Sequence, residues 1–380
     1  MLAKYNIKTI IFEKNKILGK KLLATGNGRC NIHNANTNAN EFQSSSFLTN
    51  ELESILNSFD FKAFEKICKN LGLLLTKTEN QKIYPLSNSA KSVLMIFEKH
   101  LQQAKNLKIL CENEVTKIAN FKNGFQLETN NKELHICTHL ILACGSQAHP
   151  KLGGSAKGLA LAKSLQLEIL QPYPSLTPLN CNIKSKEQIS GVKINAKITL
   201  KDSIKILAQT TNDVLFTSYG ISGFGVLDIS SYCKTKKNLE IILDLLPTLS
   251  LQELENHFLH KHNANLSLES ILCGILPPKL AKYFMQNFNF TNNTKHIKQL
   301  CFLLKNFNLK NIIPYGFEMA EVSGGGVSVK EIDAKTFASK KIKNLFIIGE
   351  MLDIVGNRGG HNLAFAWASA WHCAQAILKD

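Results

Sequence analysis

The feature that most constrains the fold is a short apolar strand that ends in an acid. Residues 7–15 read IKTIIFEKN, so the apolar run stops at Glu13. A glycine-punctuated loop, GKKLLATGNGRCNIHN, follows from Gly19 to Asn34. The second strand of a dinucleotide-binding unit ends in this way, and its carboxylate binds the ribose hydroxyls of adenosine. The segment therefore predicts an α/β domain of Rossmann type with Glu13 at a nucleotide site.

This reading calls for a Gly-x-Gly-x-x-Gly turn before the strand, but the chain begins only a few residues upstream, at Met1. The stretch GNGRCN, from Gly26 to Asn31, nearly matches that turn. Its last position is Asn, however, and no strand runs directly into it. We therefore do not expect it to be the phosphate loop.

Composition indicates a soluble globular chain long enough for two domains, with 380 residues of which 44% are hydrophobic. No apolar run approaches the roughly 18 residues of a membrane span, and the amino-terminal apolar stretch is too short for a signal peptide. A cytoplasmic location is expected. The cysteines include no C-x-x-C pair, and His257, His260 and His262 have no cysteine partner nearby, so we expect no metal site.

The chain is strongly basic, with 45 Lys and Arg against 29 acids and a formal net charge of +16. One explanation is a proteome rich in Lys, Asn and Ile, because net charge relates to partners and not to fold. The other is a polyanionic partner such as RNA. Basic residues cluster in KNKILGKK and KTKK, but no recognisable nucleic-acid-binding module accompanies them.

Periodicity places elements along the chain. Apolar residues at helical intervals predict one helix over residues 52–71 and another from about Ser89. Residues 108–142 read as a three-stranded meander with a turn at 122–124, leading to a buried strand. Short β-like segments then fill about residues 171–245, and about 246–314 look helical, with a break at Pro277-Pro278.

The features of a nucleotide-binding domain thus flank a central segment on both sides. We expect a discontinuous domain whose first part is residues 1–170 and whose second part is 315–380. Residues 171–314 would be an inserted substrate domain, made of a β-barrel (about 171–245) and a helical part (about 246–314).

Two further strands end in residues suited to a cofactor. LILACGSQ ends in Ala143-Cys144-Gly145, whose small side chains let a flat or phosphorylated ligand approach the backbone, although any buried strand can end in glycine. LFIIGEMLD ends at Gly349 and is followed by Glu350 and Asp353, whose carboxylates can accept bonds from ribityl or ribose hydroxyls or can be simple surface acids.

The last helix opens with Gly359-Gly360-His361-Asn362-Leu363. A helix start without bulky side chains can bind an anion, because its unpaired N–H groups and the positive end of its dipole face outward. A reduced flavin carries negative charge along its N1–C2=O edge and is one ligand that would benefit.

Several long blocks together resemble one known family. They are EKN, GKKLLATGNGRCN, IYPLSNSA, HPKLGGSAKGLALAKSL after LACG, LFTSYGISG, and AEVSGGGVSVKEID with LFIIGEMLDIVGNRGGHNLAFAWASA. Along essentially its whole length the sequence resembles bacterial NAD(P)/FAD-dependent oxidoreductases that include 3-dehydro-bile-acid-reductase-like and ribosomal-RNA-dihydrouridine-synthase-like flavoproteins, also labelled aminoacetone-oxidase-like.

The resemblance implies an α/β FAD-binding Rossmann-like fold of the two-dinucleotide-binding-domain type, with an inserted β-barrel and helical subdomain. Glu13 would bind the adenosine ribose, the Val115 backbone the adenine edge, and Asp353 the ribityl and phosphate region. Gly360 to Leu363 would face the pyrimidine side of the flavin. The loop from Thr25 to Asn31 would lie near the isoalloxazine ring.

The matching blocks also contribute cofactor candidates that share no single role: Lys14, Lys21, Thr25, Gly26, Gly28, Arg29, Cys30 and Asn31.

Two departures from the family pattern stand out. His361 occupies a position where an aromatic Tyr or Phe is expected. The first strand and its glycine turn are missing, so Met1 corresponds to the end of the family's first helix, and either the start codon lies upstream, which we favour, or the protein has degenerated.

The implied chemistry is reduction of a C=C bond conjugated to a carbonyl, by hydride from FAD, with NAD(P)H as a transient reductant. The net charge favours uridine in ribosomal RNA over a small 3-oxo-steroid-like enone, and aminoacetone-type amine oxidation ranks third. Cys30 and Tyr84 are candidate general acids, while Arg29 could bind a phosphate or the substrate carbonyl. A flavin-free RNA-binding relic is the alternative from another class.

Overall fold

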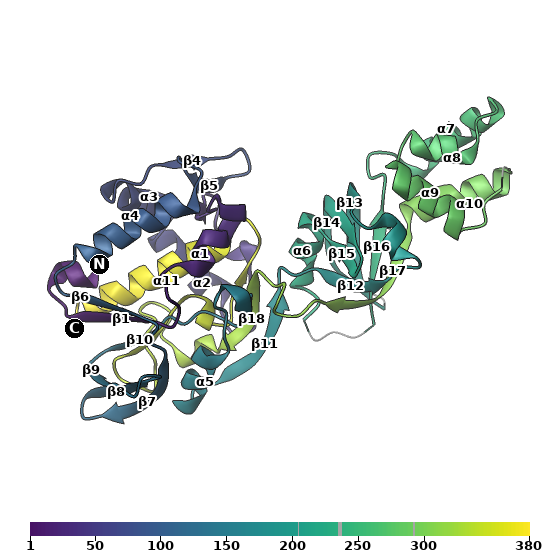
Figure 1. The fold of residues 1–380 in the computed structure, drawn as a ribbon. Helices are drawn as coiled ribbons and strands as arrows, with labels where there is room; N and C mark the ends of the chain where they lie inside the picture. Colours follow the sequence, from purple (N-terminus) through teal and green to yellow (C-terminus); the bar gives the residue numbers. More distant parts are fainter. Residues whose placement is uncertain (204, 235–237, 292) are drawn as a thin grey trace. The chain divides into compact units, whose positions relative to one another are not determined.

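The chain folds into two compact units in the computed structural model, which describes residues 1–203, 205–234, 238–291 and 293–380. The first unit combines Met1–Tyr173 with Val322–Asp380, and the second is Pro174–Glu321 (Figure 1). The sequence predicts an insertion at residues 171–314, whereas the second unit runs from Pro174 to Glu321. Residues 235–237 of the basic stretch KTKK lie outside the described residues.

Two parallel strand pairs form the nucleotide-domain part of the first unit. Strand β1 (Thr9–Glu13) pairs with β6 (Leu107–Cys111), and β10 (Leu140–Leu142) pairs with β19 (Leu345–Ile347). Parallel pairs require crossover connections, so this part is α/β, as predicted. Within the described residues, β1 and β10 each have one neighbouring strand.

The remaining elements of this unit are helices and short strands around those pairs. Its helices are α1 (Lys20–Ala24), α2 (Thr49–Ser58), α3 (Phe61–Asn70), α4 (Ala90–Gln102), α5 (Lys157–Ser164) and α11 (His361–Ile377). Its other strands are β2 (His33–Asn34), β3 (Phe42–Gln43), β4 (Leu75–Lys77), β5 (Lys82–Pro85), β7 (Val115–Phe121), β8 (Gly124–Thr129), β9 (Leu134–Cys137), β18 (Val322–Val327) and β20 (Val355–Gly356), while β11 (Ile169–Ser175) crosses the boundary at Tyr173.

The single helix predicted over residues 52–71 is wrong, because two helices, α2 and α3, occupy this range. The break falls at Phe59 and Asp60. The Asp60 side chain accepts a bond from the Ala63 N–H at 2.9 Å and caps α3. The predicted helix near Ser89 is confirmed, since Ser89 precedes α4.

The predicted meander is confirmed for β7, β8 and β9, which pair in order. Its first segment is not continuous, however. Glu112 has a left-handed φ of 57°, which separates β6 from β7, so that β6 joins β1 in the parallel pair. A non-glycine residue in this conformation interrupts a strand.

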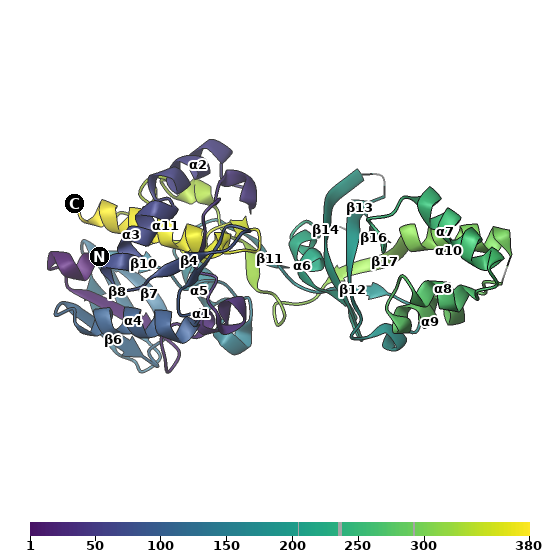
Figure 2. The same cartoon turned by 90° about the horizontal axis from the view of Figure 1, so that it is seen from above.

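Helix α11 is the central helix of the first unit, and it is drawn in yellow in both ribbon views (Figures 1 and 2). Phe365, Ala368 and Cys373 are at most 2% exposed and belong to the core of this unit. The Trp367 indole N–H donates to the Ile32 carbonyl at 3.1 Å, which ties the helix to the segment before β2.

The second unit contains a closed six-stranded barrel in the order β12-β15-β14-β13-β16-β17. These strands are β12 (Leu179–Asn182), β13 (Lys193–Asp202), β14 (Lys205–Thr217), β15 (Gly220–Ser222), β16 (Leu239–Asp244) and β17 (Phe307–Pro314). The predicted barrel range, about 171–245, therefore lacks one strand. The predicted helical range ends early, because Phe307, Leu309 and Ile312 point into the core and their segment closes the barrel as β17.

Helices of the second unit are α6 (Phe224–Ser230), α7 (Leu251–Asn263), α8 (Leu268–Cys273), α9 (Pro278–Asn287) and α10 (Thr294–Lys305). The last four form a helical subdomain between β16 and β17 (Figure 2). The predicted break at Pro277-Pro278 is confirmed, because α9 starts at Pro278, where a missing backbone N–H costs no helical bond. Barrel and helices share one buried apolar core.

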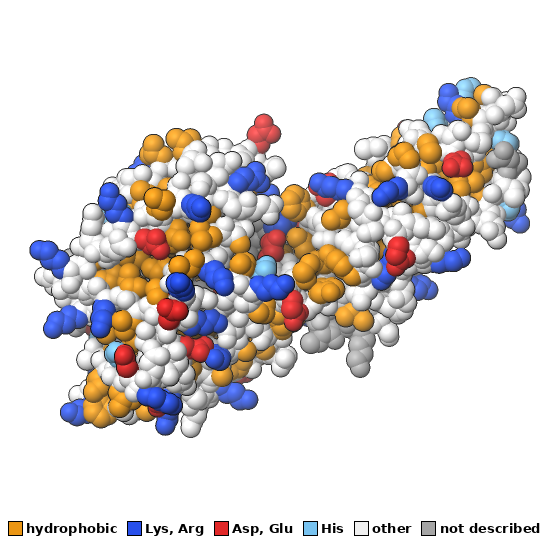
Figure 3. Space-filling view, viewed as in Figure 1, with side chains coloured by type: hydrophobic (Ala, Val, Ile, Leu, Met, Phe, Trp, Pro, Cys, Tyr) orange, Lys and Arg blue, Asp and Glu red, His pale blue; other side chains and the backbone are white. Residues whose placement is uncertain are grey.

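Charged side chains are dispersed over the face shown in Figure 3. Lys and Arg side chains there stand apart, separated by uncharged surface and by acids, in both units. The excess of basic residues thus forms no single patch on this face. Within the described part of the chain, no helix has the length and apolar character that crossing a membrane requires.

Candidate active site

The acid at the end of β1 is oriented by the residue two positions later. Glu13 Oε1 accepts bonds from the Asn15 backbone N–H and from its side-chain amide, both at 2.7 Å. The Asn113 N–H donates to the Glu13 carbonyl at 3.1 Å, which brings the start of β7 at Val115 close to this strand end. The second carboxylate oxygen remains available for a ribose hydroxyl.

The loop after α1 curls tightly because its residues adopt left-handed conformations. Gly26, Asn27, Gly28 and Cys30 have φ values of 57°, 56°, 82° and 62°. The Cys30 N–H closes the loop by donating to the Thr25 carbonyl at 2.9 Å. The predicted segment from Thr25 to Asn31 is thus one compact turn, with Gly28 and Arg29 exposed on its outside.

Arg29 and Tyr84 lie together although they come from different elements. The Arg29 guanidinium carbon is 5.4 Å from the centre of the Tyr84 ring, which lies on β5. A β-carbon on Gly26 would lie 3.4 Å from the same ring. The structure therefore joins a cation and a phenol hydroxyl at the loop expected near the isoalloxazine ring.

Cys30 lies elsewhere. Its side chain is 0% exposed and packs in the core of the first unit. Burial raises the pKa of the Cys30 thiol, and only a hydrogen bond with Thr25 opposes that effect. The Cys30 thiol is therefore enclosed in the core, whereas the Tyr84 side chain beside the same loop is only partly buried.

Glu350 joins three distant segments. Its Oε2 lies 2.9 Å from the Lys21 Nζ, and its Oε1 accepts from the Ser323 N–H at 3.0 Å. A β-carbon on Gly145 would lie 3.9 Å from Oε2. Lys21, Gly145 and Glu350, which the sequence proposes separately, are therefore neighbours. Ala143 and Cys144, just before Gly145, are exposed at the end of β10.

The start of α11 packs against the segment after the curled loop. A β-carbon on Gly360 would collide with the His33 carbonyl oxygen and lie 3.0 Å from the Asn31 amide nitrogen. The Asn34 amide donates to the Gly359 carbonyl at 3.0 Å. Only glycine fits at residue 360, where φ is 103°.

Asn362 and Leu363 complete the first turn of this helix. The Asn362 amide accepts from the Gly356 N–H at 2.8 Å and donates to the Gly356 carbonyl at 2.7 Å. Asn362 thereby holds β20 against the helix start, which is a structural use of a residue expected to contact the cofactor. Leu363 is half-buried beside it.

Asp353 is 2% exposed, and its carboxylate is occupied by a loop of serines. Its Oδ2 accepts from the Ser45 N–H at 2.8 Å and from the Ser46 hydroxyl at 3.0 Å. The Ser44 hydroxyl donates to the Asp353 carbonyl at 2.6 Å. Sequence reasoning missed these serines, for which the run Ser44-Ser45-Ser46 was the available signal.

Two buried histidines, His33 and His361, lie near the start of α11. His33 is 2% exposed, and burial lowers its pKa to about 4. His361 is 5% exposed, and burial lowers its pKa while Glu41 opposes this shift. Among the residues that the structure describes, no group of three His, Cys, Asp or Glu side chains could hold a metal ion.

The residues fit FAD well at its two ends. At Gly28 and Gly145, which are not buried, an added β-carbon would meet no atom closer than 3.9 Å, so a flat ligand could approach the backbone there. Glu13 suits the adenosine ribose, and the first turn of α11, where Gly360 packs against the His33 carbonyl, suits the pyrimidine edge. The diphosphate has less support, because the sequence contains no Gly-x-Gly-x-x-Gly turn.

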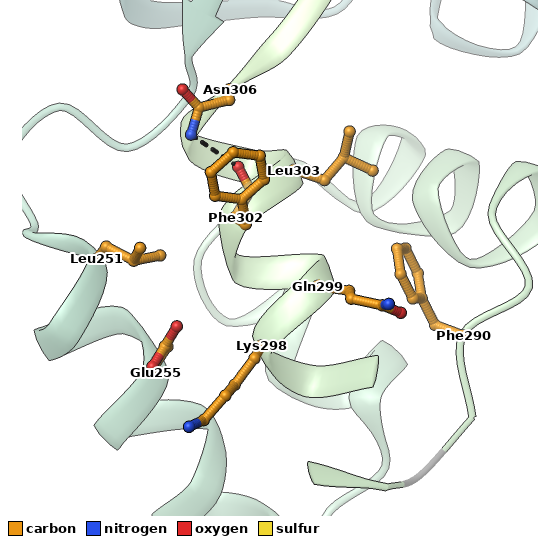
Figure 4. Close-up of a pocket in the computed structure, with 8 residues that line it drawn as sticks. All are labelled: Leu251, Glu255, Phe290, Lys298, Gln299, Phe302, Leu303 and Asn306. Atoms are coloured by element: carbon orange, nitrogen blue, oxygen red, sulfur yellow. Dashed lines mark hydrogen bonds between the residues drawn. The ribbon is translucent and has the colours of Figure 1, made fainter. Parts of the chain in front are cut away.

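A separate hollow of about 570 Å³ lies in the helical subdomain between α7 and α10 (Figure 4). Its lining is mainly apolar, with Phe302 and Phe290 facing it and with one acid, Glu255, and one base, Lys298. The two charges balance and no titratable cluster lies there. The hollow shares no residue with the cofactor candidates.

Comparison with known proteins places the whole chain in one family. The description "HI0933-like protein Rossmann domain" matches residues 1–376. A 3-dehydro-bile acid delta(4,6)-reductase of Clostridium scindens is 29% identical, over 98% of this chain and 93% of the relative. A ribosomal RNA dihydrouridine synthase of Haemophilus influenzae is 28% identical, over 100% of this chain and 94% of the relative.

Solved structures with similar folds are more distant. The Sdh1 complex of Mycobacterium smegmatis in the apo form matches with a TM-score of 0.44 at 12% identity, covering 99% of this chain and 65% of that one. A glycine oxidase from Geobacillus kaustophilus matches with a TM-score of 0.37 at 12% identity, covering 99% of this chain and 90% of that one.

Proposed function

Because the chain belongs to the HI0933-like Rossmann-domain family of FAD-dependent oxidoreductases, we propose that it reduces a C=C bond conjugated to a carbonyl, with uridine in ribosomal RNA as the substrate. NAD(P)H is the proposed reductant, and it docks transiently because the sequence holds no Gly-x-Gly-x-x-Gly turn for a separate nicotinamide domain. An RNA substrate is consistent with action in the cytoplasm.

The observation that carries the proposal is the convergence of four chain segments in the first unit. Lys21 reaches Glu350, Gly145 borders Glu350, and Asn31 borders Gly360. Each of these contacts joins segments that the sequence assigns to a cofactor for separate reasons. Glycines with open space beside them lie in the same set, which supports a flat ligand more than a chance cluster of packed residues.

Bound FAD would supply the hydride, and the protein supplies orientation and proton control. The Tyr84 hydroxyl is the proposed donor of the proton to the carbon next to the reduced one. Arg29, 5.4 Å from the centre of the Tyr84 ring, is placed to stabilise negative charge on the substrate carbonyl oxygen. Arg29 on the loop and Tyr84 on β5 therefore serve two roles in one reaction.

Uridine is favoured by the net charge of +16 and by the name of the Haemophilus influenzae relative. Phosphate contacts supply affinity for RNA, and the base has to leave its stack before it can be reduced. A small enone is the second candidate, favoured by the Clostridium scindens relative at 29% identity. Amine oxidation of the aminoacetone type and a flavin-free RNA-binding relic have no such support.

The test begins with the visible absorption spectrum of the purified 380-residue chain and the flavin content per protein. A flavin-loaded chain is then given NADH or NADPH with ribosomal RNA, or with a 3-oxo steroid enone. Dihydrouridine formation supports the proposal. Enone reduction without RNA reduction transfers the assignment to the second candidate. A chain that binds RNA but takes up no added FAD supports the relic instead.

A further inference from the structure

Three side chains form a connected group at the first turn of α11: His361 is buried, whereas Thr37 and Glu41 are partly exposed. His361, the first residue of that helix, is 5% exposed. Its Nδ1 lies 3.2 Å from the Thr37 hydroxyl oxygen, and its Nε2 lies 3.6 Å from the Glu41 Oε2. Neither partner belongs to the motifs that predict the cofactor site.

The hydrogen-bond donors and acceptors in this group of three side chains determine where its protons lie. The Thr37 hydroxyl donates its single hydrogen to the Asn34 carbonyl at 2.9 Å, so toward His361 it can only accept. Nδ1 of His361 therefore carries a hydrogen. In the neutral ring this leaves a lone pair on Nε2, which faces the Glu41 carboxylate.

Glu41 is itself held in place. The Asn357 amide donates to Glu41 Oε2 at 2.9 Å, and the Asn357 N–H donates to the Glu41 carbonyl at 2.7 Å. A fixed carboxylate facing a lone pair is repelled, whereas a second proton on Nε2 turns the same contact into an ion pair. The geometry thus favours protonation of Nε2.

Other charges set the balance. Burial lowers the pKa of His361, Glu41 raises it, and Lys82 lowers it. His33 is close enough that the two imidazoles influence each other's charge. These groups lie on the η3 turn (Ala39–Glu41), β5 and β2. The net shift of the His361 pKa is downward, which favours the neutral ring in the absence of a further negative charge.

We infer that His361 is a positioning residue for the cofactor, which takes up a solvent proton on Nε2, against Glu41, when negative charge develops at the start of α11. The inference rests on the proposed function, because the reduced flavin is the ligand that brings this charge. Proton uptake makes one N–H bond and needs no other reactant. The imidazolium then stabilises the reduced cofactor over the oxidised one.

The first test needs no cofactor. Histidine NMR titration of the cofactor-free chain follows His361, identified by its absence in His361→Phe. Glu41→Gln should lower the pKa of His361 by about 1 unit. Glu79→Gln removes the charge of an exposed acid in the same unit and should leave the titration unchanged. An unchanged titration in Glu41→Gln overturns the inference.

The second test uses the flavin-loaded chain. His361→Phe should lose about tenfold of its preference for reduced over oxidised flavin, a shift of about 30 mV in midpoint potential. Thr37→Val, which frees Nδ1, should shift the potential in the same direction. A potential that moves in neither variant overturns the role of His361 alone. A chain that takes up no flavin overturns the proposed function, and with it the cofactor role, whatever the NMR titration shows.

Discussion

The Nζ of Lys21 lies 2.9 Å from the Oε2 of Glu350, although 329 residues separate the two in sequence. Lys21 belongs to α1, in the first part of the discontinuous unit. Glu350 follows β19, in the second part. The second oxygen of Glu350 binds the backbone at Ser323. One carboxylate therefore connects both parts of the nucleotide-binding unit.

Removing the charge of Glu350 should weaken the connection between the two parts of the nucleotide-binding unit. Glu350→Gln keeps an acceptor for Ser323 but loses the ion pair, and we expect it to lower the free energy of unfolding by about 1 kcal/mol. FAD affinity should fall as well. Glu65→Gln breaks the exposed Glu65–Lys69 pair and should change neither quantity measurably. Equal effects of both variants in urea unfolding and flavin titration would contradict the assigned role.

Gly145 tests the cofactor surface directly. Gly145→Ala adds one methyl group at a left-handed position, where we expect a cost of about 1 kcal/mol in stability together with a loss of FAD binding. Gly72 has a similar φ of 81° and no neighbour within 4 Å, so Gly72→Ala carries the same backbone strain. Flavin titration should separate the two variants, and equal affinities would argue against a ligand at Gly145.

Cys30 and Tyr84 should show opposite phenotypes. Cys30→Ala removes a fully buried side chain, so it should destabilise the protein by about 1 kcal/mol and leave turnover intact. Tyr84→Phe should preserve stability and slow turnover by about 100-fold, because it removes the proposed proton donor. Steady-state rates with substrate saturating decide between them. Lost turnover in Cys30→Ala with normal turnover in Tyr84→Phe would reverse the assignment.

Acid should destabilise the first unit through His33. Its pKa is about 4 in the folded protein and about 6.5 when exposed, so between these values the unfolded chain binds more protons. The contribution of His33 to the free energy of unfolding is therefore fully present above pH 6.5 and is lost, by about 3 kcal/mol, as the pH drops toward 4. Burial, the main cause of the low pKa of His33, also lowers the pKa of His361.

Tryptophan fluorescence reports this loss, because Trp367 and Trp371 both lie in α11 and the sequence contains 2 Trp. Unfolding midpoints in urea between pH 4 and pH 7 give the slope. His33→Gln should flatten it, whereas His257→Gln, which changes an exposed histidine of the second unit, should leave it as it is. A slope that survives in His33→Gln would assign the pH dependence to other groups.

The strands and turns of the nucleotide-binding unit were predictable because their signals are local. The apolar runs before Glu13 and Gly349 are visible in the sequence, and both form parallel strands. Strand β1 ends at Glu13, and β19 ends at Ile347, two residues before Gly349. The break between α2 and α3 was hidden, since Phe59 and Phe61 continue the helical spacing on either side of it. Only the capping bond of Asp60 ends one helix and begins the next.

Other features depend on contacts that no spacing records. Cys30 is two residues from exposed Gly28, yet the left-handed turn directs it into the core. Asp353, which is predicted at the cofactor from its place after β19, also accepts bonds from Ser45 and Ser46 that no sequence spacing predicts. Likewise, β17 looked like the end of a helical region, and its identity as a strand follows from pairing with β12 and β16.

The place of β17 in the barrel has a consequence for synthesis on the ribosome. The barrel lacks its closing strand until residues 307–314 have emerged, and until then β12 and β16 each expose a free edge. Such edges are templates for aggregation in a nascent chain. The four helices between β16 and β17 make local contacts that form quickly, so they can fold first and shorten the span that β17 has to close.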